Sequence, residues 1–160
     1  MGSIPGLISL LYLATISLFG IGDTAPSLEG VQWLKGKAPV FSNQVTVVEL
    51  WRPSCGNCKA QIPHLTSLQK QYGDKLTIAA ISKEPLEAIE DFIKTNGDQM
   101  DFMVGKASAE IADRYMAGIS GVPYAYIIKD LLNFKEQLLK FIRQFYSYSH
   151  IGVIICQANT

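Results

Sequence analysis

The sequence has little charge and few cysteines, and both shortages limit what the protein can be. Charged residues make up 18% of the 160-residue chain, the net charge is zero, and no run of basic residues occurs. This pattern argues against a nucleic-acid-binding surface. Three cysteines are too few for a small fold held together by disulfides. Apolar residues make up 48%, which is enough for a sizeable core in a single domain.

The first residues of the chain also lack positive side chains, because no lysine or arginine precedes Lys35. The apolar stretch LISLLYLATISLF (residues 7–19) is shorter than the roughly 20 residues of a membrane-spanning helix. Its length is typical of the apolar region of a secretory signal peptide. We therefore predict that residues 1–21 form a signal peptide or membrane anchor. A buried element of the domain, or an extension without a role, is the alternative.

Between residues 45 and 129, apolar strand patterns alternate with helical ones. Strands are expected over residues 45–51, 75–82, 101–105 and 122–129, where β-branched and apolar residues dominate. Helices are expected from the cysteine pair to Gly73, from Pro85 to Gly97 and from Ser108 to Gly118. Repeated strand–helix units predict an α/β fold with a mostly parallel sheet covered on both faces.

Two of the cysteines, Cys55 and Cys58, lie two residues apart just after the first buried strand. Cys55 is expected where the next helix begins, so unpaired backbone N–H groups and the helix dipole should lower the pKa of its thiol. Cys58 lies one turn further along the same helix. The spacing predicts one exposed nucleophilic thiol and one sheltered thiol that resolves a mixed disulfide.

Two other interpretations of this cysteine pair stay open. A structural zinc site usually needs four ligands, and the other candidates are His64, His150 and Cys156. His64 follows Cys58 by six residues on the same helix, which is poor geometry, so we predict no metal. A purely structural disulfide is the remaining alternative to redox chemistry.

The segment VVELWRPSCGNCKAQIPHL resembles the active-site segment of the thioredoxin superfamily, and in particular of its TlpA-like, redoxin-type thiol–disulfide oxidoreductases. IGDTAPSLEGVQWLKGK resembles the entry segment of that branch, Pro63 follows the second cysteine by five residues, and SGVPYAYIIKD resembles the strand that begins at a cis-proline. The resemblance covers about residues 20–130. It implies a thioredoxin-like three-layer sandwich whose Cys55–Cys58 disulfide serves in place of a separate cofactor.

The resemblance also implies roles for individual residues. Glu49, on the central strand, would take the proton of Cys58 if its carboxyl is buried, although an outward-facing side chain is the alternative. Trp51 would pack beside the active-site loop, in which Gly56 and Asn57 separate the cysteines. A cis Val122–Pro123 bond would leave the backbone of Val122 free to pair with an extended substrate; the alternative is an ordinary trans proline at a strand start.

The sequence departs from the family pattern in two places. Ser54 precedes the first cysteine where the family usually has an aromatic residue, and Asn57 stands where proline is common. No turn glycine occurs between Tyr124 and Phe145, so we predict that a helix replaces the usual C-terminal hairpin. We therefore divide the chain into residues 1–21, a thioredoxin-like domain over 22–130, and an atypical C-terminal helix and tail over 131–160. Cys156 is expected to be a core residue rather than a redox thiol.

The predicted function is exchange of the Cys55–Cys58 dithiol or disulfide with protein thiols and disulfides, together with an unidentified upstream reductant or oxidant. A non-catalytic thioredoxin-like binding module and a peroxiredoxin-like peroxidase are the alternatives. We expect no nucleic-acid partner, and contact with a membrane only through an N-terminal anchor. Residues 1–21 also decide the compartment: secreted, envelope or membrane-anchored with a signal segment, and cytoplasmic without one.

Overall fold

The computed structural model describes residues 22–41 and 44–129, together with the backbone of residues 153–157. Strands and helices alternate along most of this length, as the sequence predicts. In chain order they are β1 (Gln32–Lys35), β2 (Val45–Leu50), α1 (Gly56–Tyr72), β3 (Leu76–Ser82), α2 (Leu86–Asn96), β4 (Met103–Lys106), α3 (Ala109–Met116), β5 (Tyr124–Lys129) and β6 (Val153–Gln157). Short 3₁₀ turns follow α1 and α2.

The strands form one mixed sheet in the order β1-β4-β3-β2-β5-β6. The central strands β4, β3 and β2 are parallel, as their helical crossovers require. β1 and β5 run antiparallel to their inner neighbours. β2 therefore lies inside the sheet, and every one of its residues is buried.

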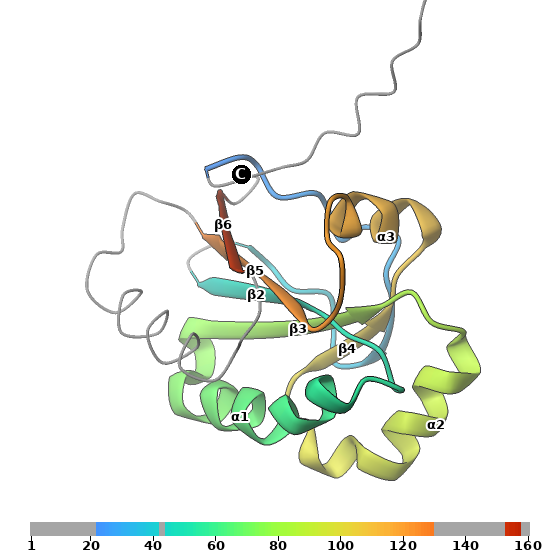
Figure 1. Ribbon diagram of the computed structural model, residues 1–160. Coiled ribbons are helices and arrows are strands. Elements are labelled where there is room, and N and C mark those ends of the chain that lie inside the picture. Colours follow the sequence, from blue (N-terminus) through green and yellow to red (C-terminus); the bar gives the residue numbers. More distant parts are fainter. Residues whose placement is uncertain (1–21, 42–43, 130–152, 158–160) are drawn as a thin grey trace, which may run out of the picture.

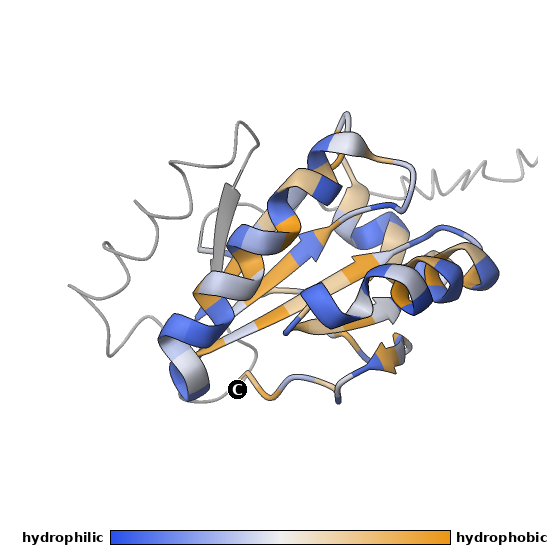
Figure 2. Cartoon of the chain, turned by 90° about the horizontal axis from the view of Figure 1, so that it is seen from below, coloured by the Kyte–Doolittle hydropathy of each residue, from blue (hydrophilic) through white to orange (hydrophobic). Residues whose placement is uncertain are grey.

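Helices cover both faces of the sheet, so the domain has three layers (Figure 1). One apolar cluster joins alternate residues of β2 to α1 and α2, and the other joins the intervening residues to α3 and the segment before β1. Apolar residues concentrate on the strands, and polar residues mark the outer surfaces of the helices (Figure 2). This arrangement is the expected thioredoxin-like α/β fold.

Helix ends follow from local chemistry. The Ser108 hydroxyl oxygen accepts a hydrogen bond from the Ile111 N–H at 3.3 Å, which caps α3 as predicted. Gly73, with φ of 51°, ends α1. α3 ends at Met116, two residues before the glycine that was expected to end it.

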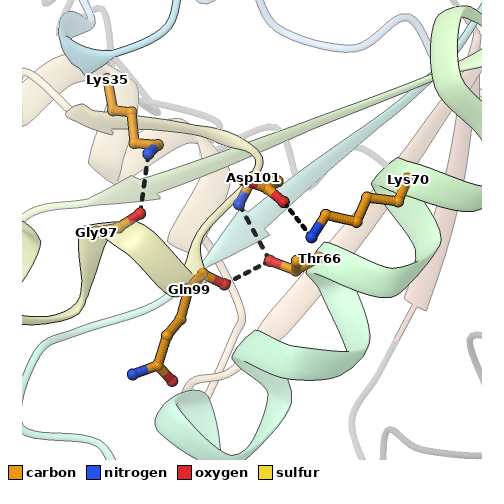
Figure 3. A network of polar contacts seen from close by, with 6 residues as sticks. All are labelled: Lys35, Thr66, Lys70, Gly97, Gln99 and Asp101. Carbon is orange, nitrogen blue, oxygen red and sulfur yellow. Dashed lines mark hydrogen bonds and ion pairs between the residues drawn. The ribbon is translucent and has the colours of Figure 1, made fainter.

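Hydrogen bonds tie α1 to the connection between α2 and β4 (Figure 3). Thr66 of α1 donates through Oγ1 to the Gln99 carbonyl at 2.6 Å and accepts from the Asp101 N–H at 3.1 Å. Lys70 forms an ion pair with Asp101 at 2.8 Å, and this contact lowers the pKa of the exposed carboxyl. The contacts hold the helix that carries the cysteines against the sheet.

Two strands of the structure were not predicted. β1 pairs with β4 at a sheet edge, and β6 occupies the edge beside β5. β6 runs parallel to β5, so it is not the second strand of a hairpin. The helix predicted over residues 131–145 lies outside the described residues, as do residues 1–21. In the part of the chain that the structure describes, no helix is long and apolar enough to cross a membrane.

Candidate active site

The two cysteines lie at the junction between β2 and α1. Cys55 is the N-cap residue of α1, with an extended backbone, and its Sγ accepts a hydrogen bond from the Cys58 N–H at 3.1 Å. The Cys55 N–H donates to the Arg52 carbonyl at 3.1 Å, which closes the turn between strand and helix. A thiolate at this position would receive an N–H donor and the positive end of the helix dipole.

Cys55 and Cys58 form a disulfide, with their Cα atoms 5.2 Å apart. Cys55 is 7% exposed and Cys58 is 4% exposed. The sequence led us to expect an exposed first cysteine, but in the oxidised protein both are largely covered. The two cysteines therefore differ little in exposure, and Cys55 is the more exposed of the pair.

The segment before β5 lies against Cys55. The Val122 carbonyl oxygen lies 3.6 Å from Cys55 Sγ, and the Val122–Pro123 peptide bond is cis. Pro123 is buried, whereas Val122 is half-buried. Residues 67 positions apart in the sequence are thus brought into contact at the ends of two adjacent strands.

Glu49 is 2% exposed and lines a small cavity together with Cys58. Its side chain is on the same face of β2 as Val45 and Val47, which pack against α1. Its register partners on both sides are small, Ala80 in β3 and Ala125 in β5. Burial raises the pKa of the Glu49 carboxyl well above its usual range.

A cavity of about 10 Å³ lies between Glu49 and the second cysteine, and both residues line it. Ala80, Ile62 and Leu65 form part of its wall. A single water molecule needs roughly 10–15 Å³ and polar partners. The cavity therefore has about the size of one water, with the Glu49 carboxyl as its polar side.

Trp51 forms the wall next to α2. It is buried, and its ring centroid lies 5.1 Å from that of Phe92. Lys59 Nζ lies 5.8 Å from the centre of the same Phe92 ring. Gly56 and Asn57, between the cysteines, are exposed. The site thus has a rigid aromatic side and an open tip.

A larger pocket, of about 240 Å³, adjoins the site on the α3 side of the sheet. Trp51, Arg52 and Val122 border both the pocket and the turn that carries the cysteines. Sequence reasoning missed this pocket, because its lining comes from four separated segments. One indication of the pocket was present in the sequence. Arg52 and Lys83 each directly follow a predicted strand, at residues 45–51 and 75–82, which places both at the same edge of a parallel sheet.

Among the described residues, no group of three His, Cys, Asp or Glu side chains is placed to hold a metal ion.

A disulfide at the start of a helix, next to a cis-proline strand and over a buried carboxyl, defines a thioredoxin-like protein. The sequence pattern of the AhpC/TSA family matches residues 21–135, and the chain belongs to that family. The resemblance to the thioredoxin superfamily is thereby confirmed.

One sequence relative matches part of the chain. The thioredoxin-like protein YneN of Bacillus subtilis (strain 168) is 27% identical over 82 residues, which cover 50% of this chain and 48% of YneN. The chain thus matches about half the length of that relative.

Solved structures share the fold. The thioredoxin domain of the thiol-disulfide oxidoreductase BVU-2223 from Bacteroides vulgatus is similar at a TM-score of 0.60 and 19% identity, with 79% of this chain and 98% of that one covered. A thiol:disulfide interchange protein from Bacteroides sp. gives a TM-score of 0.55 at 19% identity, covering 68% and 74%. StoA from Bacillus subtilis gives 0.53 at 20% identity, covering 66% and 81%.

Proposed function

We propose that the protein is a thiol–disulfide oxidoreductase that exchanges its Cys55–Cys58 pair with thiols and disulfides of protein substrates. The observation that carries the proposal is the position of Cys55. Cys55 caps α1, and its Sγ accepts a hydrogen bond from the Cys58 N–H. It also lies against Val122, which precedes the cis-proline Pro123. These contacts support Cys55 as the attacking sulfur and Cys58 as the resolving one.

In the proposed reaction, the Cys55 thiolate attacks one sulfur of a substrate disulfide and forms a mixed disulfide, releasing the first substrate thiolate. The Cys58 thiol then loses its proton, and its thiolate attacks Cys55 Sγ. The second substrate thiolate leaves, and the substrate has gained the two electrons that the protein has lost. The reverse sequence oxidises a substrate dithiol, and the relative reduction potentials set the direction.

Glu49 is the proposed acceptor of the Cys58 proton. Its buried carboxyl has a raised pKa, and it shares the water-sized cavity with Cys58. A carboxyl with a raised pKa takes up and releases its proton at higher pH than an ordinary glutamate does. A water in the cavity would connect the two groups without any movement of the strand.

Val122 and Trp51 are the proposed contacts to the substrate backbone and side chains. Pro123 has no N–H, so the Val122 carbonyl next to Cys55 can accept a hydrogen bond from an extended substrate segment. The upstream partner that restores the starting redox state would react at the same sulfur, Cys55 Sγ.

The test is reduction of insulin disulfides with dithiothreitol as electron source, comparing Cys55→Ser, Cys58→Ser and the control Cys156→Ser. Cys55→Ser should abolish activity, because the nucleophile is lost. Cys58→Ser, reduced and then freed of dithiothreitol before the substrate is added, should accumulate a mixed disulfide with the substrate, because no second thiol in the site resolves it. Cys156→Ser should behave as wild type.

Alkylation of the reduced protein at neutral pH tests the assignment of roles independently. Cys55 should react faster than Cys58, since Cys55 is the N-cap residue of α1 and lies at the positive end of the helix dipole. Faster alkylation of Cys58 would reverse the roles. A folded, reduced protein that fails to accelerate insulin reduction at all would instead indicate a binding module without exchange activity.

A further inference from the structure

The pocket beside the disulfide is lined by apolar side chains that the proposed exchange reaction does not use. Leu50 and Ile81 form its floor at the ends of β2 and β3, and Ala112, Met116 and Ile119 form its far wall. At about 240 Å³, it is smaller than the roughly 300–1,000 Å³ typical of small-molecule and cofactor sites. Its size and lining suit one bulky apolar side chain.

Polar side chains stand at the edge of this pocket and are mainly basic. Arg52 and Lys83 are exposed lining residues, and Glu84 is the acidic one. Within residues 22–41 and 44–129, neither Arg52 nor Lys83 takes part in an ion pair. The pocket edge thus has two cations available to a carboxylate of a bound partner.

Val122 borders both the pocket and the redox centre. The Val122 carbonyl oxygen lies 3.6 Å from Cys55 Sγ, and the same residue lines the pocket. An extended chain advances about 3.3 Å per residue. A substrate whose cysteine faces Cys55 would therefore present a residue one or two positions away to the pocket.

From this arrangement we infer a substrate class: polypeptides with a bulky apolar residue within two positions of the reacting cysteine and an acidic residue next to it. The apolar side chain enters the pocket, and the carboxylate binds Arg52 and Lys83 at its edge. This inference rests on the proposed exchange reaction and adds the selection of its substrates.

The test uses short synthetic peptides that each carry one cysteine in a mixed disulfide with a chromophoric thiol. The flanking positions hold either phenylalanine or glycine, each combined with glutamate or lysine. We expect the reduced wild-type protein to prefer the phenylalanine–glutamate peptide over the glycine–lysine peptide by about tenfold in kcat/KM, which is equivalent to about 1.4 kcal/mol. The chromophoric thiol's own symmetrical disulfide is the substrate without a peptide.

Two variants locate the preference. Ala112→Phe fills the pocket and should remove the preference for phenylalanine, whereas Ala88→Phe on the exposed face of α2 should retain it. Lys83→Glu adds no bulk to the core and should invert the preference between glutamate and lysine. It therefore decides the question if Ala112→Phe does not fold.

The outcomes separate the two proposals. If wild type reacts with the symmetrical disulfide but treats all peptides alike, or if Lys83→Glu keeps the wild-type preference, the pocket does not select substrates and only this inference fails. If no disulfide reacts with the folded, reduced protein, the exchange reaction itself is wrong and this inference falls with it.

Discussion

Replacing Glu49 with glutamine should change how the stability of the oxidised protein depends on pH. Burial raises the pKa of this carboxyl above its ordinary value of 4.5, so between pH 4.5 and the raised pKa the folded protein binds a proton that the unfolded chain does not. The stability that this bound proton contributes is fully present below pH 4.5 and is lost as the pH rises through this window. Glu49→Gln has no proton to lose and should not show this loss.

The size of the effect follows from proton linkage. A difference of one bound proton gives a slope of about −1.4 kcal/mol in the free energy of unfolding per pH unit. The stability of Glu49→Gln relative to wild type should therefore rise by about that amount per pH unit above about pH 5, and level off at the raised pKa. Subtracting the two proteins cancels all other titrating groups.

The measurement is urea unfolding of both disulfide-bonded proteins from about pH 4 to about pH 9, followed by tryptophan fluorescence. Glu90→Gln is the matched control, because Glu90 is exposed on α2. Its curve should run parallel to wild type. A stability difference between Glu49→Gln and wild type that stays constant over the whole range would show that Glu49 is not buried in a low-dielectric environment.

Three further results are expected. Glu49→Gln should slow the resolution step by at least about tenfold while the initial attack by Cys55 is nearly unchanged; rapid-quench measurements separate the steps, and equal slowing would reject the proton-transfer role. Gly105→Ala should cost about 1–3 kcal/mol, since a Cβ there would lie 3.1 Å from Trp33 Cε3 and collide with Val31 across the β1–β4 pair; an unchanged urea midpoint would contradict this packing. Thr66→Val should cost about 1 kcal/mol by removing both hydrogen bonds of its hydroxyl, whereas Ser67→Ala, at an exposed position of α1, should be nearly neutral, and equal costs would assign the loss to the helix rather than to the network.

Local chemistry let the sequence predict the elements that carry the cysteines. The apolar run before Trp51 predicts β2, and the periodic residues Ile62, Leu65 and Leu68 predict α1, because period two and period 3.6 are properties of short segments. Gly73 and Ser108 marked a helix end and a helix start through their own backbone and side-chain chemistry. The position of Cys55 at a helix N-terminus followed from these boundaries alone.

Long-range pairing decided the rest. The side chain of Glu49 faces α1 because β2 is an inner strand in register with Ala80 and Ala125, and a single sequence does not state that register. β1 is a strand because a sheet edge accepts it, not because of a strong pattern of its own. β6 does contain a β-branched run, but its place beside β5 comes from long-range pairing. The pocket beside the disulfide has the same origin: its walls come from four separate segments, which only the folded sheet brings together.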